Sequence, residues 1–163
     1  ERFSCLNEML KELNRNLFRD TADERFVTLA CCLINEKDKT LEVARAGHTE
    51  ILIQVPGHNI RIISPEGSAL GIFPDEMTSN FDSIQFSFQK DMIMLFFTDG
   101  ITEALDASSQ EYGLPKLLKS FSSSGEKMME PNEIIDSIIR SVDAFTANTP
   151  QSDDQTLVAL KFR

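Results

Sequence analysis

Asp99 lies one residue beyond a short apolar run, after Thr98 and directly before a glycine. The run, Met92 to Phe97, is typical of a buried β-strand. A carboxylate at the end of such a strand is held at the sheet edge, and Gly100 lets the backbone turn sharply and lets a ligand come close. Hard divalent cations prefer oxygen donors that are fixed in this way. Taken alone, the motif is more often an ordinary Asp-Gly turn.

A second acidic motif, Asp153 and Asp154, lies just before the last apolar run of the chain, with Thr156 two residues further on. Adjacent carboxylates repel each other, and a divalent cation would offset that repulsion. A solvated turn, in which neighbouring acids cost little, explains the pair equally well and is the commoner case. Neither acidic motif identifies a metal site by itself.

His48 is a third candidate, because it follows Gly47 and its imidazole could act as an acid, a base or a metal ligand. Nothing near it in the sequence completes a catalytic constellation, so a structural role is favoured. The sequence has no glycine-rich phosphate loop and no nucleophile elbow.

Seven apolar or alternating runs predict the strands that would position these residues. They are residues 26–34, 41–43, 50–55, 59–63, 84–88, 92–97 and 156–162. Residues 26–34 are almost entirely apolar, which predicts a buried strand. Residues 35–39, and Pro56 with Gly57, are typical of hairpin turns.

Apolar residues three and four apart predict three helices. These are residues 3–17, residues 114–121, and a third helix from Pro131 to about residue 142. Residues 122–125 are predicted to be a flexible link, and residues 67–75 and 148–154 to be loops. One helix, many strands, two helices and a final strand indicate an α+β fold with an antiparallel sheet.

The composition limits the classes of function. With 163 residues, the chain fits one domain, and its net charge of −10 argues against nucleic acid as a ligand. No apolar run is long enough to cross a bilayer, and no signal peptide is visible. We therefore expect a cytoplasmic domain without membrane contact of its own, and a membrane tether upstream in the parent protein stays open. Cys5, Cys31 and Cys32 lack metal-site spacing and are predicted to be reduced packing residues.

The order of these motifs resembles the PPM family of metal-dependent protein phosphatases, in its bacterial SpoIIE/RsbU-like branch. The most specific match is LFFTDGITEA at residues 95–104. Further matches in the family's order are LNEML at 6–10, RFVTL at 25–29, LEVARAGH at 41–48, ALGI at 69–72, Tyr112-Gly113 and DDQTLV at 153–158. The resemblance covers nearly the whole chain and implies an antiparallel β-sandwich flanked by helices.

The resemblance also implies a site and a reaction. Asp99 and Asp153 match metal ligands of the family, and Asp154 could exchange roles with Asp153. The supporting residues are Thr98, Gly100, Gly47, His48 and Thr156. A complete domain would hold two Mn²⁺ or Mg²⁺ ions, and a water activated by them would attack a phosphoserine or phosphothreonine. The implied substrate is a phosphorylated anti-anti-sigma factor, a STAS-domain protein whose dephosphorylation frees a sigma factor.

One departure from the family is plain in the sequence. The upstream Gly-Gly-Asp and Asp-Val-x-Gly-x-Gly motifs, which carry further metal-binding aspartates, are absent, and the chain starts at Glu1. We therefore expect a domain truncated at its N-terminal side, weakly active or inactive alone, because affinity for a divalent cation grows with the number of ligands. An exposed sheet edge would make a homodimer plausible. The alternative function is a catalytically degenerate binding module of the same fold.

Overall fold

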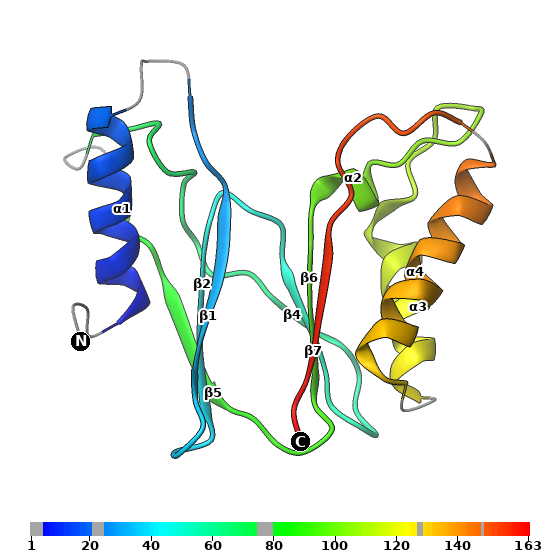
Figure 1. Cartoon of the computed structure of the whole chain (residues 1–163), viewed down its shortest axis with the longest axis horizontal. Coiled ribbons are helices and arrows are strands. Elements are labelled where there is room, and N and C mark those ends of the chain that lie inside the picture. Colours follow the sequence, from blue (N-terminus) through cyan, green and yellow to red (C-terminus); the bar gives the residue numbers. More distant parts are fainter. Residues whose placement is uncertain (1–4, 21–24, 75–79, 127–128, 148) are drawn as a thin grey trace. The chain divides into compact units, whose positions relative to one another are not determined.

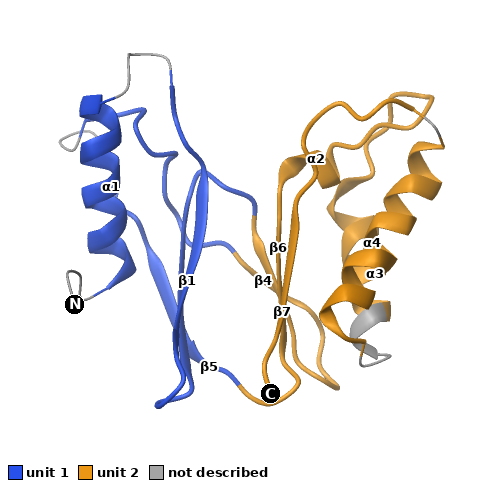
Figure 2. Cartoon of the chain, in the orientation of Figure 1, with its two compact units in different colours: residues 1–49, 64–88 blue, residues 50–63, 89–163 orange. Residues whose placement is uncertain are grey.

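A computed structural model of the chain describes residues 5–20, 25–74, 80–126, 129–147 and 149–163 (Figure 1). They form two compact units, coloured separately in Figure 2. The first unit comprises Glu1–Thr49 and Ser64–Phe88, and the second comprises Glu50–Ile63 and Gln89–Arg163. The expectation that all 163 residues form a single domain stays a prediction.

The first unit combines one helix with a three-stranded antiparallel sheet. Helix α1 is Leu6–Asp20, and the strands are β1 (Leu29–Asn35), β2 (Thr40–Ala46) and β5 (Ser83–Ser87), in the order β1-β2-β5. Leu6 and Leu10 on the apolar face of α1 are buried against Ala44, Ala46 and Phe81. The helix prediction is therefore confirmed for the residues that the structure describes; Phe3, its predicted first apolar residue, lies outside them.

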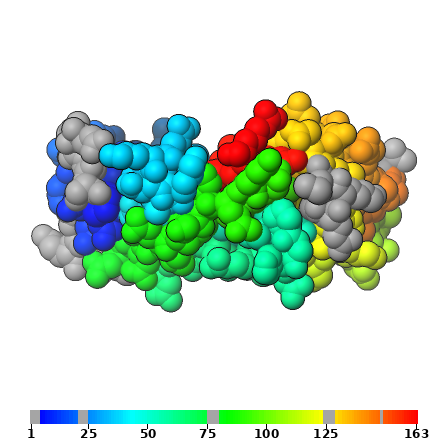
Figure 3. Space-filling view, turned by 90° about the horizontal axis from the view of Figure 1, so that it is seen from below, coloured from blue at the N-terminus to red at the C-terminus, as the bar shows by residue number. Residues whose placement is uncertain are grey.

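The prediction of a buried strand at residues 26–34 is wrong in its burial. Strand β1 starts at Leu29, and none of its residues is buried. Phe26 is 60% exposed and Leu33 is 52% exposed. The reason is position: among the described residues, β1 pairs only with β2 and forms an edge of its sheet. An apolar run predicts a strand, but it does not specify how many neighbours the strand has. In the space-filling view, the turn between β1 and β2 (light blue) lies on the surface (Figure 3).

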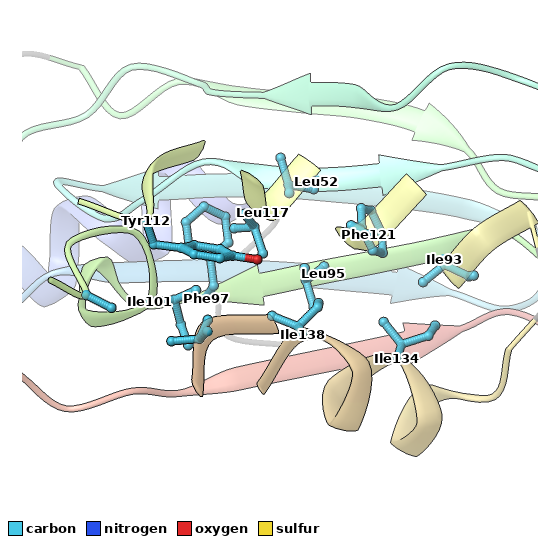
Figure 4. Packing of buried hydrophobic residues seen from close by; sticks show 12 residues of the cluster. Leu52, Ile93, Leu95, Phe97, Ile101, Tyr112, Leu117, Phe121, Ile134 and Ile138 are labelled. Atoms are coloured by element: carbon cyan, nitrogen blue, oxygen red, sulfur yellow. The ribbon is translucent and has the colours of Figure 1, made fainter. Parts of the chain in front are cut away.

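The second unit has a four-stranded antiparallel sheet with helices packed on it. The strands are β3 (Ile51–Gln54), β4 (Arg61–Ile63), β6 (Ile93–Phe97) and β7 (Leu157–Lys161), in the order β4-β3-β6-β7. The helices are α2 (Asp99–Thr102), α3 (Gly113–Glu126) and α4 (Pro131–Thr146). Leu95 and Phe97 of β6, Leu117 and Phe121 of α3, and Ile138 of α4 belong to one buried cluster (Figure 4).

The two long helices of this unit differ in how well they were predicted. Helix α4 begins with Pro131 after Glu130 as N-cap, and Glu133 completes a capping box, so the predicted start is confirmed. Helix α3 continues through residues 122–125, where a flexible link was expected, and that prediction is wrong. Serine disfavours helices only slightly, and burial of Phe121 holds this turn against the core.

The α+β prediction with antiparallel sheets and helices is confirmed. The three cysteines are free thiols and partly buried, in agreement with a packing role. Among the described residues, no helix has both the length and the apolar character that a membrane span needs.

Candidate functional site

The pairing of β6 with β7 brings the two acidic motifs to the same end of one sheet. The strands are antiparallel, and Phe97 at the end of β6 is opposite Leu157 at the start of β7. One residue further on, the backbone nitrogen of Thr98 donates a hydrogen bond to the carbonyl oxygen of Thr156, at 3.1 Å. Asp99 follows β6, and Asp153 and Asp154 precede β7, so the strand register places all three at the same end of the sheet.

The side chain of Thr98 ties the two segments together. Its hydroxyl donates to the carbonyl oxygen of Asp154 at 2.9 Å and accepts from the backbone nitrogen of Thr156, also at 2.9 Å. These two bonds extend the β6–β7 contact past its last ladder pair. Thr98 and Thr156 are two of the predicted supporting residues. Their hydrogen bonds hold the backbone before Asp99 against the backbone that follows Asp153.

Gly100 allows the two segments to approach closely. A β-carbon at this position would lie 2.4 Å from the carbonyl oxygen of Asp154 and 3.3 Å from the carbonyl carbon of Asp153. Real β-carbons essentially never approach another atom to 2.4 Å, so a residue other than glycine would push the segments apart. Gly100 is buried and belongs to the first turn of α2, and the side chain of Asp99 beside it is exposed.

The carboxylates of Asp99 and Asp153 are each oriented by a local hydrogen bond. Oδ1 of Asp99 accepts from the backbone nitrogen of Gly100 at 3.0 Å, and Oδ1 of Asp153 accepts from that of Asp154 at 2.7 Å. All three aspartates are exposed to solvent. In the part of the chain that the structure describes, Oδ2 of Asp99 and Oδ2 of Asp153 accept no hydrogen bond, so each carboxylate keeps one oxygen open to a ligand.

This donor set fits a hard divalent cation only in part. The open atoms are carboxylate oxygens, which suit Mg²⁺ and Mn²⁺ and not Zn²⁺. However, no three histidine, cysteine, aspartate or glutamate residues among those described gather as a complete set of metal ligands. Mg²⁺ is often held by one or two carboxylates with water in its other positions. These residues can therefore form one side of a metal centre.

Gly47 and His48, the other predicted supporting residues, belong to the first unit, whereas the aspartates belong to the second. Nδ1 of His48 lies 3.1 Å from the hydroxyl of Thr28. The backbone carbonyl oxygen of His48 accepts a hydrogen bond from the guanidinium of Arg45. Gly47 has a φ of 62° and would place a β-carbon 2.7 Å from the backbone nitrogen of Ala69. These contacts explain the Gly-His pair as a local structural element of the first unit.

Two further residues support the acidic segments, and sequence reasoning missed both. Nε2 of Gln151 donates a hydrogen bond to the carbonyl oxygen of Asp153 at 2.6 Å. The hydroxyl of Thr102 donates one to the carbonyl oxygen of Asp99 at 3.1 Å. Thr102 lies three residues after Asp99, a spacing at which such a bond forms within a single helical turn. The role of Gln151 depends on how the loop before β7 folds, and no sequence signal indicated it.

Comparison with known proteins agrees with this geometry. Residues 2–163 match the family model of stage II sporulation protein E (SpoIIE). A search of curated protein sequences gave no match.

Solved phosphatase domains share the fold at low sequence identity. The SiaA-PP2C domain of Pseudomonas aeruginosa is 14% identical with a TM-score of 0.78, and the match covers 95% of this chain and 59% of that one. The PP2C phosphatase domain of SpoIIE from Bacillus subtilis, with a fragment of its regulatory domain, is 20% identical with a TM-score of 0.76, covering 96% and 44%. The RsbU and RsbW domains of a Mycobacterium tuberculosis protein are 18% identical with a TM-score of 0.70, covering 96% and 41%.

The chain thus spans well under two thirds of each of these solved chains. Its fold is that of PP2C phosphatase domains, and the chain belongs to the SpoIIE family.

Proposed function

We propose that the second unit carries half of the metal site of a protein serine/threonine phosphatase. The observation that supports this most strongly is the close approach of Asp99-Gly100 to Asp153-Asp154, held by Thr98, in a chain of the SpoIIE family. Phosphate-ester hydrolysis needs little covalent chemistry from the protein, but it needs positioning and charge stabilisation. Fixed carboxylates that hold cations at a sheet edge provide both.

Asp99 and Asp153 are the residues proposed to hold the metal, with Asp154 beside them. When bound, two divalent cations supply an activated water and neutralise charge on the phosphoryl oxygens. A related structure supports the choice of ion: that of RsbX, 15% identical with a TM-score of 0.63, is a complex with magnesium. The local hydrogen bonds from the nitrogens of Gly100 and Asp154 leave the second oxygen of each carboxylate available for this purpose.

We further propose that residues 1–163 alone are weakly active or inactive. The described residues offer no complete set of three metal ligands, and the chain spans only 59% and 44% of the SiaA and SpoIIE chains that it matches. Affinity for a hard cation depends on the number and charge of its ligands. The remaining carboxylates would come from protein outside residues 1–163.

The proposed substrate is a phosphoserine or phosphothreonine on a regulatory protein, for which an anti-anti-sigma factor of the STAS type is the candidate that the SpoIIE/RsbU-like branch favours. The proposed setting is the cytoplasm, without nucleic acid or membrane as a partner of this domain. Self-association is a separate proposal, supported by the exposed apolar residues Phe26 and Leu33 beside and on β1.

The test is Mn²⁺-dependent hydrolysis of p-nitrophenyl phosphate and of a phosphoserine protein, comparing residues 1–163 with the longer protein that contains them. We expect turnover in the longer protein, and a loss of at least about a hundredfold with Asp99→Asn. Asp136→Asn is the matched control, because Asp136 is an exposed aspartate on α4, outside the proposed site. Equal turnover in the Asp99 variant would remove Asp99 from the mechanism.

The degenerate binding module is the second candidate, because the described residues hold no group of three potential metal ligands. Absence of turnover in the longer protein on both substrates, together with retained binding of the phosphoserine protein, would support the module and contradict the enzyme. Metal-dependent turnover in the longer protein would support the enzyme and contradict the binding module.

A further inference from the structure

Helices α3 and α4 form a groove whose lining is basic and hydroxylic. The α3 side presents Lys116 and Lys119, and the α4 side presents Arg140. Four serines complete the lining of a cavity of about 630 Å³, including Ser137 and Ser141. On each helix, the lining residues follow one another at steps of one or three positions, within the spacing i, i+3, i+4 and i+7 of a single helix face. The groove lies within the second unit and shares no residue with the Asp99–Asp153 edge.

The charge of this lining is opposite to that of the whole protein. The chain has 26 acidic and 16 basic residues, a net charge of −10. The groove gathers three basic residues and includes no carboxylate. Like charges close together repel, and here no acidic side chain of the lining compensates them. An anion bound in the groove would offset the repulsion between these basic side chains.

One end of the groove is rigid. Nζ of Lys116 donates to the carbonyl oxygen of Tyr112 at 3.0 Å and lies 4.4 Å from the centre of the Phe145 ring. The hydroxyl of Tyr112, the residue just before α3, lies 2.8 Å from the hydroxyl of Ser141 on α4. Tyr112 itself is buried in the core of the second unit, as Figure 4 shows. A fixed ammonium group and a fixed hydroxyl therefore stand at this end before any ligand binds.

The donors beyond that end are unused. Among the described residues, the side chains of Lys119, Arg140 and Ser137 make no hydrogen bond and no ion pair. A guanidinium offers a planar pair of N–H donors that matches phosphate, and an ammonium and a hydroxyl add single donors. The cavity is of the size that small-molecule ligands occupy.

We propose that the α3–α4 groove is a binding site for a phosphate group of a small anionic molecule, separate from the proposed phosphatase centre. Lys119 and Arg140 would contact the phosphate oxygens directly, and Lys116 would contribute fixed positive charge. The proposal does not rest on the phosphatase function, because neither Asp99 nor a metal takes part in it.

The test is a titration of the ¹⁵N-labelled chain with inorganic phosphate, followed by NMR at constant ionic strength balanced with sodium chloride. We expect saturable shifts confined to amides of α3 and α4. The double variant Lys119→Ala/Arg140→Ala should weaken binding by roughly tenfold or more, a modest figure because the groove is open to solvent. The matched control is Lys37→Ala/Lys90→Ala, which removes the same charge at exposed turns.

Three results would overturn the proposal. Shifts that do not saturate indicate only the general effect of salt. Saturable shifts that map to other elements place the anion elsewhere. An equal loss of affinity in the control pair shows that net charge, and not this groove, governs binding. A titration with pyrophosphate, which should bind more tightly through its second phosphate, provides an independent check on the same amides.

Discussion

Replacing Gly100 by alanine tests the close approach on which the candidate site depends. The added β-carbon would lie 2.4 Å from the carbonyl oxygen of Asp154, and the segments must separate until that distance exceeds the 3.0 Å below which such contacts essentially never occur. The obstacle is backbone, so no side-chain rotation relieves it. The same carbonyl oxygen accepts a hydrogen bond from the hydroxyl of Thr98 at 2.9 Å, so moving the segments apart also weakens this hydrogen bond.

Two opposing effects decide the sign of the change in stability. Alanine in a helix is favoured over glycine by at most about 1 kcal/mol, and less in a helix as short as α2. Overpacking costs about 1–3 kcal/mol, and weakening a hydrogen bond adds up to about 1 kcal/mol. We therefore expect Gly100→Ala to lower the free energy of unfolding by about 1–3 kcal/mol.

Urea unfolding measures that free energy, and amide NMR shifts show where the backbone moves. Gly57→Ala is the control, because Gly57 has a φ of 76° and open space around its missing β-carbon. Its cost comes from conformation alone, so it should leave the amides of Asp154 and Thr156 unchanged. A Gly100→Ala variant as stable as the parent, with unchanged shifts at Asp154, would refute the close approach.

Three further predictions concern the elements around the site. Tyr112→Phe removes the hydroxyl that lies 2.8 Å from that of Ser141, and urea unfolding should show a loss of about 1 kcal/mol with the fold retained. Glu133→Ala removes half of the capping box with Glu130, and should cost α4 about 0.5–1 kcal/mol, measured in the same way. Burial raises the pKa of the Cys32 thiol to about 11. The unfolded thiol ionises first as the pH rises, so its contribution to stability is complete below about pH 8.5 and is lost as the pH approaches 11. Alkylation of Cys32 at pH 9 should therefore be much slower in the folded than in the urea-unfolded chain; equal rates would contradict this burial.

The parts of the fold that were predictable are those in which local pattern and tertiary environment agree. Strand β6 is apolar and almost entirely buried, so its sequence predicted the strand and the place of Asp99 just beyond its end. Its partner β7 was recognised only as a strand, but antiparallel pairing sufficed to bring Asp153 to the same end. The closeness of Asp99 to Asp153 was therefore predictable from two strand ends, and their role as metal ligands stays a prediction.

The parts that were not predictable depend on neighbours that the sequence does not specify. Strand β1 is apolar apart from its last residue, Asn35, yet it is an edge strand, and its side chains remain partly or largely exposed. The serines after Phe121 are typical of a link, yet packing of α3 on the sheet extends the helix through them. The role of Gly100 in admitting the Asp154 backbone follows from a contact over more than fifty residues of sequence, which the Asp-Gly motif only hinted at.

The most direct test of the central claim is where Mn²⁺ binds to residues 1–163. Substoichiometric Mn²⁺ broadens amide signals near the ion, so ¹⁵N NMR locates it even when no turnover occurs. We predict selective broadening of Asp99, Gly100, Asp153 and Asp154, abolished by Asp99→Asn and retained in Asp136→Asn. Broadening that is absent at these amides at millimolar Mn²⁺, or that persists unchanged in the Asp99 variant, would contradict the assignment of this sheet edge as a metal site.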